Sequence, residues 1–141
     1  MKPTPDIDPS ISTEQVCFVI VKVREFEVKE WSSGLTSGSN PSDDSMLEVL
    51  ETRRNDPVFD ELSAFIDGLD EDRQIDLVAL AWVGRGDFDI GEWEEARAEA
   101  ARAHNNRTAA YLLGMPLLSE FLQDALSETG RSCADVEREH L

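Results

Sequence analysis

The chain has 141 residues, of which 40 % are hydrophobic, and its 30 acidic and 13 basic residues give a formal net charge of −17. That length fits one domain, and that apolar share is typical of a globular rather than a disordered chain. A surface this acidic repels phosphate groups, so direct binding of nucleic acid or of an anionic membrane is not expected. No apolar run approaches the roughly 20 residues that a membrane-spanning helix needs.

The N-terminal sequence "MKPTPDIDPS" lacks the apolar segment and the cleavage site of a secretory signal. It predicts an extended arm over residues 1–10, ahead of a single domain over residues 11–141, and a cytoplasmic location. The only cysteines are Cys17 and Cys133. In a reducing compartment two thiols so far apart in sequence need not form a disulfide, and Cys17 lies in an apolar run that predicts a core position.

The first regular element is predicted to begin at Ser12, which stands three residues before Gln15 in the spacing of a capping box. Apolar residues then recur at nearly helical intervals. The β-branched run "VIVKV" also suits a strand, so residues 16–28 are interpreted as a helix, with a strand as the alternative.

The stretch "SSGLTSGSNPSDDS", residues 32–45, is the clearest loop in the sequence. Asn40, Asp43 and Asp44 bring several oxygen atoms together within residues 39–44, a composition that could hold a cation or a polar group of a partner. The alternative is an ordinary turn in which one aspartate caps the helix that follows it.

The rest of the sequence alternates helical segments with helix start and stop signals. Asp56 followed by Pro57 begins one helix, and Asp70 begins another that is apolar on most sides and is therefore expected to be central and buried. Residues 92–106, rich in Ala, Glu and Arg, and the amphipathic residues 115–130 add two more. The predicted fold is all-α, a single compact domain of about six or seven short helices.

An acidic glycine loop, residues 85–92 of "LAWVGRGDFDIGEWEEAR", follows the buried helix. Asp87, Asp89 and Gly91 imitate the start of an EF-hand, which requires a glycine at its sixth position and a glutamate at its twelfth. Counted from Asp87, these positions hold Glu92 and Ala98. Calcium binding is therefore not expected.

A simpler role for this loop is to end one helix and begin the next. Gly84 or Gly86 is expected to form a left-handed cap, and Asp87 or Asp89 is expected to cap the following helix. The Arg-Gly-Asp tripeptide in the loop matches an integrin ligand, but a chain without an export signal has no route to that receptor. Arg85 is instead expected to pair with a nearby carboxylate.

Catalytic and metal-binding motifs are weak in this sequence. Glu137 and His140 have the E-x-x-H spacing of di-iron ligands, but such sites need two of these motifs and two further carboxylates. The other histidine, His104, is expected at a helix end, where its charge suits the helix dipole. No nucleophile elbow, Walker loop or Rossmann glycine pattern is present. The sequence therefore predicts no catalytic residue, no cofactor and no bound metal.

Four blocks of sequence carry a resemblance: "VKVREFEVKEW", "GSNPSDD", "DLVALAWVGRGDFD" and "TAAYLLGMPLLSEFL". In this order they resemble a family of small, acidic, uncharacterised bacterial proteins known only as a domain of unknown function. The likeness extends from about Ile11 to Leu141. It implies an α-helical domain of bacterial origin, and it implies no activity.

The leading functional interpretation is a non-enzymatic protein-interaction or regulatory module that binds through an apolar or acidic helical face. Trp31 and Trp93 are the first candidate anchors, because aromatic side chains concentrate binding energy in interfaces; the alternative for both is a half-buried core position. The net charge is about −2 over residues 1–35 and about −8 over residues 36–75. This asymmetry would let the first segment dock on acidic helices of its own chain or of a second copy in a homo-oligomer.

Two other functional classes are alternatives. One is a carboxylate-based enzyme or metal-binding protein, in which Asp43, Asp44, Asp87 and Asp89 converge in one site. The other is a DNA-mimic inhibitor, in which a one-sided stripe of carboxylates occupies a basic groove of another protein.

Overall fold

The computed structural model describes residues 7–32 and 57–134. All regular elements in this part are helical, which confirms the predicted all-α fold. They are α1 (Thr13–Ser32), α3 (Pro57–Asp67), α4 (Glu71–Arg85), the single 3-10 turn η2 (Ile90–Glu92), α5 (Trp93–Ala103), α6 (Thr108–Leu113) and α7 (Leu118–Glu128). The helix expected after residue 45 and the motif at Glu137 and His140 lie outside the described residues.

Helix α1 begins at the predicted capping box. The hydroxyl of Ser12 accepts the backbone N–H of Gln15 at 3.0 Å, and the side-chain oxygen of Gln15 accepts the backbone N–H of Ser12 at 3.0 Å. Residues 16–28 are helical throughout, so the strand alternative is wrong. The β-branched residues are tolerated because Val16, Val19 and Ile20 are almost fully buried, and tertiary packing outweighs their lower helix propensity.

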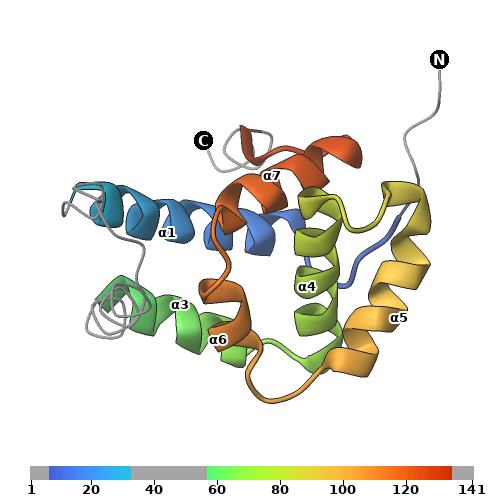
Figure 1. Ribbon diagram of the computed structural model, residues 1–141, viewed down its shortest axis with the longest axis horizontal. Helices are drawn as coiled ribbons and strands as arrows, with labels where there is room; N and C mark the ends of the chain where they lie inside the picture. Colours follow the sequence, from blue (N-terminus) through green and yellow to red (C-terminus); the bar gives the residue numbers. More distant parts are fainter. Residues whose placement is uncertain (1–6, 33–56, 135–141) are drawn as a thin grey trace, which may run out of the picture.

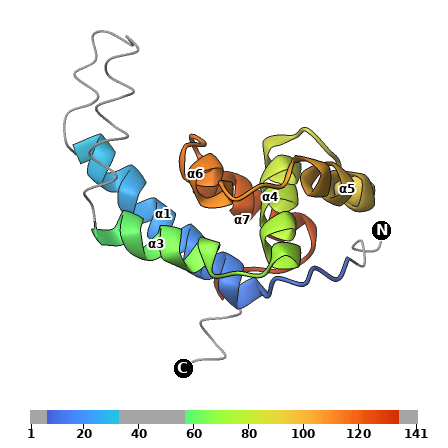
Figure 2. The same ribbon diagram turned by 90° about the horizontal axis from the view of Figure 1, so that it is seen from below.

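The helices form two neighbouring pairs with α7 packed against both of them (Figure 1). Helices α1 and α3 lie side by side, and α4 and α5 form an antiparallel hairpin beside them. Seen from below, α6, α7, α4 and α5 stand in a row next to the α1–α3 pair (Figure 2). Helix α7 contacts both α1 and α4, so it joins the two pairs into one body.

The core lies where these elements meet. The large side chains that are almost completely buried come from α1, α3, α4, α6 and α7, and include Ile20, Leu62, Ile66, Leu77, Leu80, Leu112, Leu118 and Leu122. Helix α4 contacts α5, α6 and α7, and its residues 75–81 are all buried. The prediction of a central buried helix is therefore confirmed.

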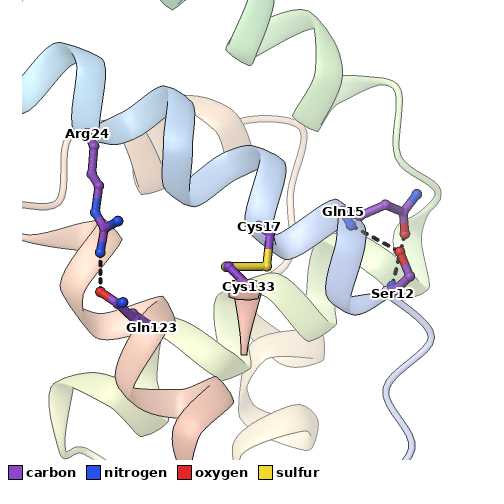
Figure 3. Close-up of a disulfide and its surroundings, with 6 residues drawn as sticks. All are labelled: Ser12, Gln15, Cys17, Arg24, Gln123 and Cys133. Atoms are coloured by element: carbon purple, nitrogen blue, oxygen red, sulfur yellow. Dashed lines mark hydrogen bonds between the residues drawn. A yellow bond between two sulfur atoms is a disulfide. The ribbon is translucent and has the colours of Figure 1, made fainter. Parts of the chain in front are cut away.

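A disulfide joins Cys17 of α1 to Cys133, which follows α7 (Figure 3). The sequence did not require this disulfide, and the structure contains it. Helix α7 packs along α1 and returns the chain to within 5.6 Å between the two Cα atoms, although the cysteines are far apart in sequence. The expected core position of Cys17 is correct, since it is 6 % exposed.

The ends of α4 follow the predicted signals. The carboxylate of Asp70 accepts the backbone N–H of Arg73 at 2.9 Å and begins the helix. Gly86, rather than Gly84, ends it with a φ of 98°, a left-handed conformation that a glycine adopts without steric cost.

Gly84 has a packing role instead. A Cβ atom at this position would lie 1.7 Å from the backbone oxygen of Phe121, so the absence of a side chain is what lets α4 and α7 approach each other so closely. Backbone atoms cannot move aside as a flexible side chain can.

We expect Gly84→Ala to destabilise the fold by about 3 kcal/mol, because the added methyl group must push α7 away from α4. Urea unfolding followed by circular dichroism measures this change. Gly91→Ala is the matched control, since a Cβ at Gly91 meets nothing within 4 Å. Equal stability of the two variants would contradict the close approach.

Candidate functional site

The loop between α4 and α5 contains the three predicted site residues Arg85, Asp87 and Asp89. The guanidinium of Arg85 contacts the carboxylate of Asp87, at 2.7 Å from Nε and 2.6 Å from one terminal nitrogen. Partial burial lowers the pKa of Arg85, but the hydrogen bond and the charge of Asp87, with a smaller contribution from Tyr111, outweigh it and raise that pKa overall. The predicted pairing of Arg85 with a carboxylate is confirmed.

Asp89, rather than Asp87, begins the next helical turn. The backbone N–H of Asp89 donates to the carboxylate of Glu92 at 2.9 Å, and the backbone N–H of Glu92 donates to the carbonyl of Asp89 at 2.8 Å. The other predicted polar residues, Asn40, Asp43 and Asp44, lie outside the described residues. In the two described ranges, no group of three His, Cys, Asp or Glu side chains is arranged to hold a metal ion.

The two candidate tryptophan anchors have different outcomes. Trp93 begins α5 and is only 4 % exposed, so it is a core residue and not a surface anchor. The side chain of Trp31 lies outside the described part of the chain. Two aromatic side chains that are at least partly exposed lie close together instead: Trp82, near the end of α4, and Tyr111 of α6, which is 44 % exposed.

Two hollows meet at Trp82, and we call them together the Trp82 groove. The first, of about 450 Å³, lies between α4, the end of α5 and α6, and is lined by Ile75, Val78, Trp82, Ala100, Ala103, His104, Asn105, Arg107, Thr108, Ala110 and Tyr111. The second, of about 620 Å³, lies between α4 and α5 and is lined by Trp82, Arg85, Asp87, Phe88, Glu95, Ala98, Glu99 and Arg102. The predicted residues Arg85 and Asp87 therefore belong to the wall of the second hollow.

The position of Trp82 between the hollows is fixed from both sides. Its indole N–H donates to the hydroxyl of Tyr111 at 2.8 Å, and its ring stacks near that of Phe88 with 6.1 Å between the centroids. A tryptophan held in this way presents apolar area at little further cost in side-chain entropy when a ligand binds.

His104 lies in the wall of the first hollow, directly after α5. Its Nε2 lies 2.7 Å from the side-chain oxygen of Gln74, and its Nδ1 lies 3.4 Å from the carboxylate of Glu71. The amide nitrogen of Gln74 donates to the carbonyl of Ile66 at 2.9 Å. His104 therefore ties the end of α5 to the start of α4, in agreement with its predicted place at a helix end.

One buried charge was missed by the sequence analysis. Asp76 is 0 % exposed, although it stands in the most apolar helix of the chain. One carboxylate oxygen accepts the backbone N–H groups of Ser10 at 2.5 Å and Ile11 at 3.2 Å, and the other accepts the guanidinium of Arg97 at 2.5 Å. The hydrogen bond that Arg97 donates to Asp76, opposed by partial burial, raises the pKa of Arg97, and the negative charges of Asp76 and Asp72 raise it further.

A family model described as "Protein of unknown function (DUF3775)" matches residues 59–131. The chain belongs to this family. Curated proteins gave no match, and solved structures gave none either. The matched range contains every residue of the Trp82 groove, whereas α1, the segment at residues 7–12 and both cysteines lie outside it.

None of the helices in the described part of this DUF3775 protein is long and apolar enough to cross a membrane.

The sequence signal that would have revealed Asp76 is its isolation, a single carboxylate in the apolar run "IDLVALAWV". A charged residue at such a position is rare unless it is paired. The sequence contains no comparable signal for the Trp82 groove, because the residues that line this groove come from three helices.

We expect Asp76→Asn to destabilise the protein by about 3 kcal/mol. Both oxygens of Asp76 face donors, so either orientation of the amide would point its NH₂ group at an N–H group. Thermal or urea unfolding measures the loss. Arg102→Gln is the control, because the Arg102–Glu99 pair is exposed and should contribute about 0.5 kcal/mol or less. Similar losses in both variants would contradict a special role for Asp76.

Glu128 provides a pH-dependent prediction. Partial desolvation raises the pKa of Glu128, although this residue is exposed at the surface, and the nearby charges of Asp89 and Asp124 raise that pKa further. The folded state therefore favours the protonated form, so this stabilisation is present below the ordinary glutamate pKa and is lost as the pH rises through the raised value. Glu128→Gln should increase the melting temperature at about pH 7 and lose that advantage near about pH 4.

The control for this pH series is Glu120→Gln, on an exposed position of the same helix. We expect its melting temperature to follow that of the wild-type protein at both pH values. A Glu128→Gln variant with the same small effect at both pH values would contradict the assigned cause.

Proposed function

We propose that this DUF3775 protein is a non-enzymatic binding module, and that its Trp82 groove holds a cationic amphipathic segment of another protein. The observation that carries this proposal is the first hollow of the groove. It has a volume of about 450 Å³, within the range of specific binding pockets, and its walls are mainly apolar side chains of α4, α5 and α6.

The shape of the groove suits a peptide segment. Ile75, Val78 and Trp82 follow one another at helical spacing along α4, and with α5 and α6 they form an apolar floor. Amphipathic helices bind other proteins by placing apolar side chains into grooves of this kind. The fixed Trp82–Tyr111 pair would form one wall for an aromatic or branched aliphatic anchor residue of the partner.

The net charge of the whole chain favours a cationic partner, while the groove itself is lined by three arginines and three carboxylates. Many of the basic side chains already contact an acidic group of this chain: Lys22, Arg73, Arg85, Arg97 and Arg102. Because the sequence has 30 acidic and only 13 basic residues, such pairing leaves a large surplus of carboxylates. One of them, Glu95, lies on the exposed side of α5 in the wall of the second hollow. Basic residues of the partner would be attracted to that end of the groove.

The alternatives have less support. In a carboxylate-based site Asp87 would have to be available, but it is paired with Arg85, and the backbone of Asp89 is used to begin η2. A DNA mimic binds its partner through a continuous stripe of carboxylates. The mainly apolar first hollow would have no role in that kind of binding. A cytoplasmic location, a bacterial origin and homo-oligomer formation stay predictions from the sequence.

The test uses Ala103→Lys, which places a bulky positive charge at an exposed alanine of the first hollow without altering the core. Ala101→Lys, an exposed position on the same helix that does not line the groove, is the matched control. Both proteins are screened against a displayed library of random short peptides, and the affinities of selected peptides are measured by calorimetry.

We expect the peptides selected by the wild-type protein to share a bulky apolar residue flanked by Lys or Arg. Ala103→Lys should weaken their binding by about tenfold or more, and Ala101→Lys should leave it unchanged. Selection of no peptide, or equal binding by both variants, would contradict the proposal.

A further inference from the structure

The segment at residues 7–12, which precedes α1, is packed onto the body of the protein, and we call it the N-terminal strap. Ile7 is 8 % and Ile11 is 3 % exposed. The strap is attached at two places: Asp76 accepts the backbone N–H groups of Ser10 and Ile11, and the guanidinium of Arg131 donates to the carbonyl of Ile7 at 3.1 Å.

The second attachment depends on the position of the chain after α7. Gly130 turns that chain with a φ of 77°, and Arg131 and Cys133 follow within three residues. The disulfide to Cys17 then fixes this short segment against α1, as Figure 3 shows. The hold of Arg131 on Ile7 therefore relies on a covalent bond made two residues further along the chain.

We propose that the Cys17–Cys133 disulfide is a reversible thiol-exchange site that controls the N-terminal strap. When the disulfide is intact, Arg131 is held in place and the strap is closed. When the disulfide is reduced, residues 131–134 detach, Arg131 releases Ile7, and the strap opens from that end, so that the backbone N–H groups of Ser10 and Ile11 separate from Asp76 more often. This inference is independent of the proposed binding function.

The two sulfur atoms differ in accessibility. Cys17 is 6 % exposed, whereas Cys133 is partly exposed. A dithiol reductant would therefore attack the sulfur of Cys133 through one of its thiolates, forming a mixed disulfide and expelling the thiolate of Cys17, which takes up a proton. The second reductant thiolate then attacks the reductant sulfur of that mixed disulfide and releases Cys133 as a thiolate, which is protonated in turn.

The exchange is balanced. Two electrons pass from the dithiol to the protein disulfide, the two protons of the dithiol end on Cys17 and Cys133, and the reductant leaves as its own disulfide. Closing the strap again is the same reaction in reverse with a disulfide oxidant.

Opening the strap would enlarge a small hollow of mixed polar and apolar lining at its edge. This hollow, of about 170 Å³, is lined by strap residues together with Val16, Leu80 and Leu126 of α1, α4 and α7, and also by Arg131. The core beneath would remain in place, because α4 and α7 also hold each other through close backbone packing at Gly84. Reduction is therefore expected to cause a local change and not global unfolding.

The experiment is amide hydrogen exchange on the full chain, with and without dithiothreitol, together with mass spectrometric counting of free thiols. We expect no free thiol before reduction and two after it. The amides of Ser10 and Ile11 and of residues 131–134 should then exchange about tenfold faster or more, while the amides of Leu77 and Leu80 keep their protection.

Two variants test separately whether the disulfide and Arg131 hold the strap. Cys133→Ser should show the fast exchange without any reductant. Arg131→Gln, with the disulfide intact, should loosen the strap in both redox states but leave residues 132–134 protected until the reductant is added. Free thiols in the untreated protein, unchanged exchange at Ser10 and Ile11 after reduction, or loss of protection throughout α4 would each overturn the proposal.

Discussion

The buried carboxylate of Asp76 is the constraint on which the arrangement of this protein depends. A charge that is 0 % exposed is tolerated only when its oxygens have donors, and the donors here are the N-terminal strap and Arg97. Three parts of the chain that are far apart in sequence must therefore meet at one point. Their meeting fixes the strap and the α4–α5 hairpin relative to each other.

Helix α4 packs against α5, α6 and α7, which explains why it is apolar on most sides. Leu77 and Leu80 face the core, and Gly84 permits the close approach of α7. Ile75, Val78 and Trp82 line the groove instead. A helix that lines both a core and a surface groove needs this distribution of apolar side chains.

The residues that match the DUF3775 model and the residues that the disulfide joins are different parts of the chain. The matched residues 59–131 supply the whole groove and the Asp76–Arg97 pair, whereas the strap, α1 and both cysteines lie outside them. The groove thus belongs to the part that the family model describes. The disulfide and the strap are additions that hold α1 and the end of the chain against that part.

The sequence by itself determined the helical class and the local ends of helices, because these depend on neighbouring residues. The capping box at Ser12, the start at Asp70 and the pairing of Arg85 are all interactions over three residues or fewer. Only the tertiary structure decided that Trp93 is buried, that Cys17 meets Cys133, and that the Trp82 groove exists. The Trp82–Tyr111 contact joins residues 29 positions apart and the disulfide joins residues 116 positions apart, and no local pattern specifies which helix faces will meet.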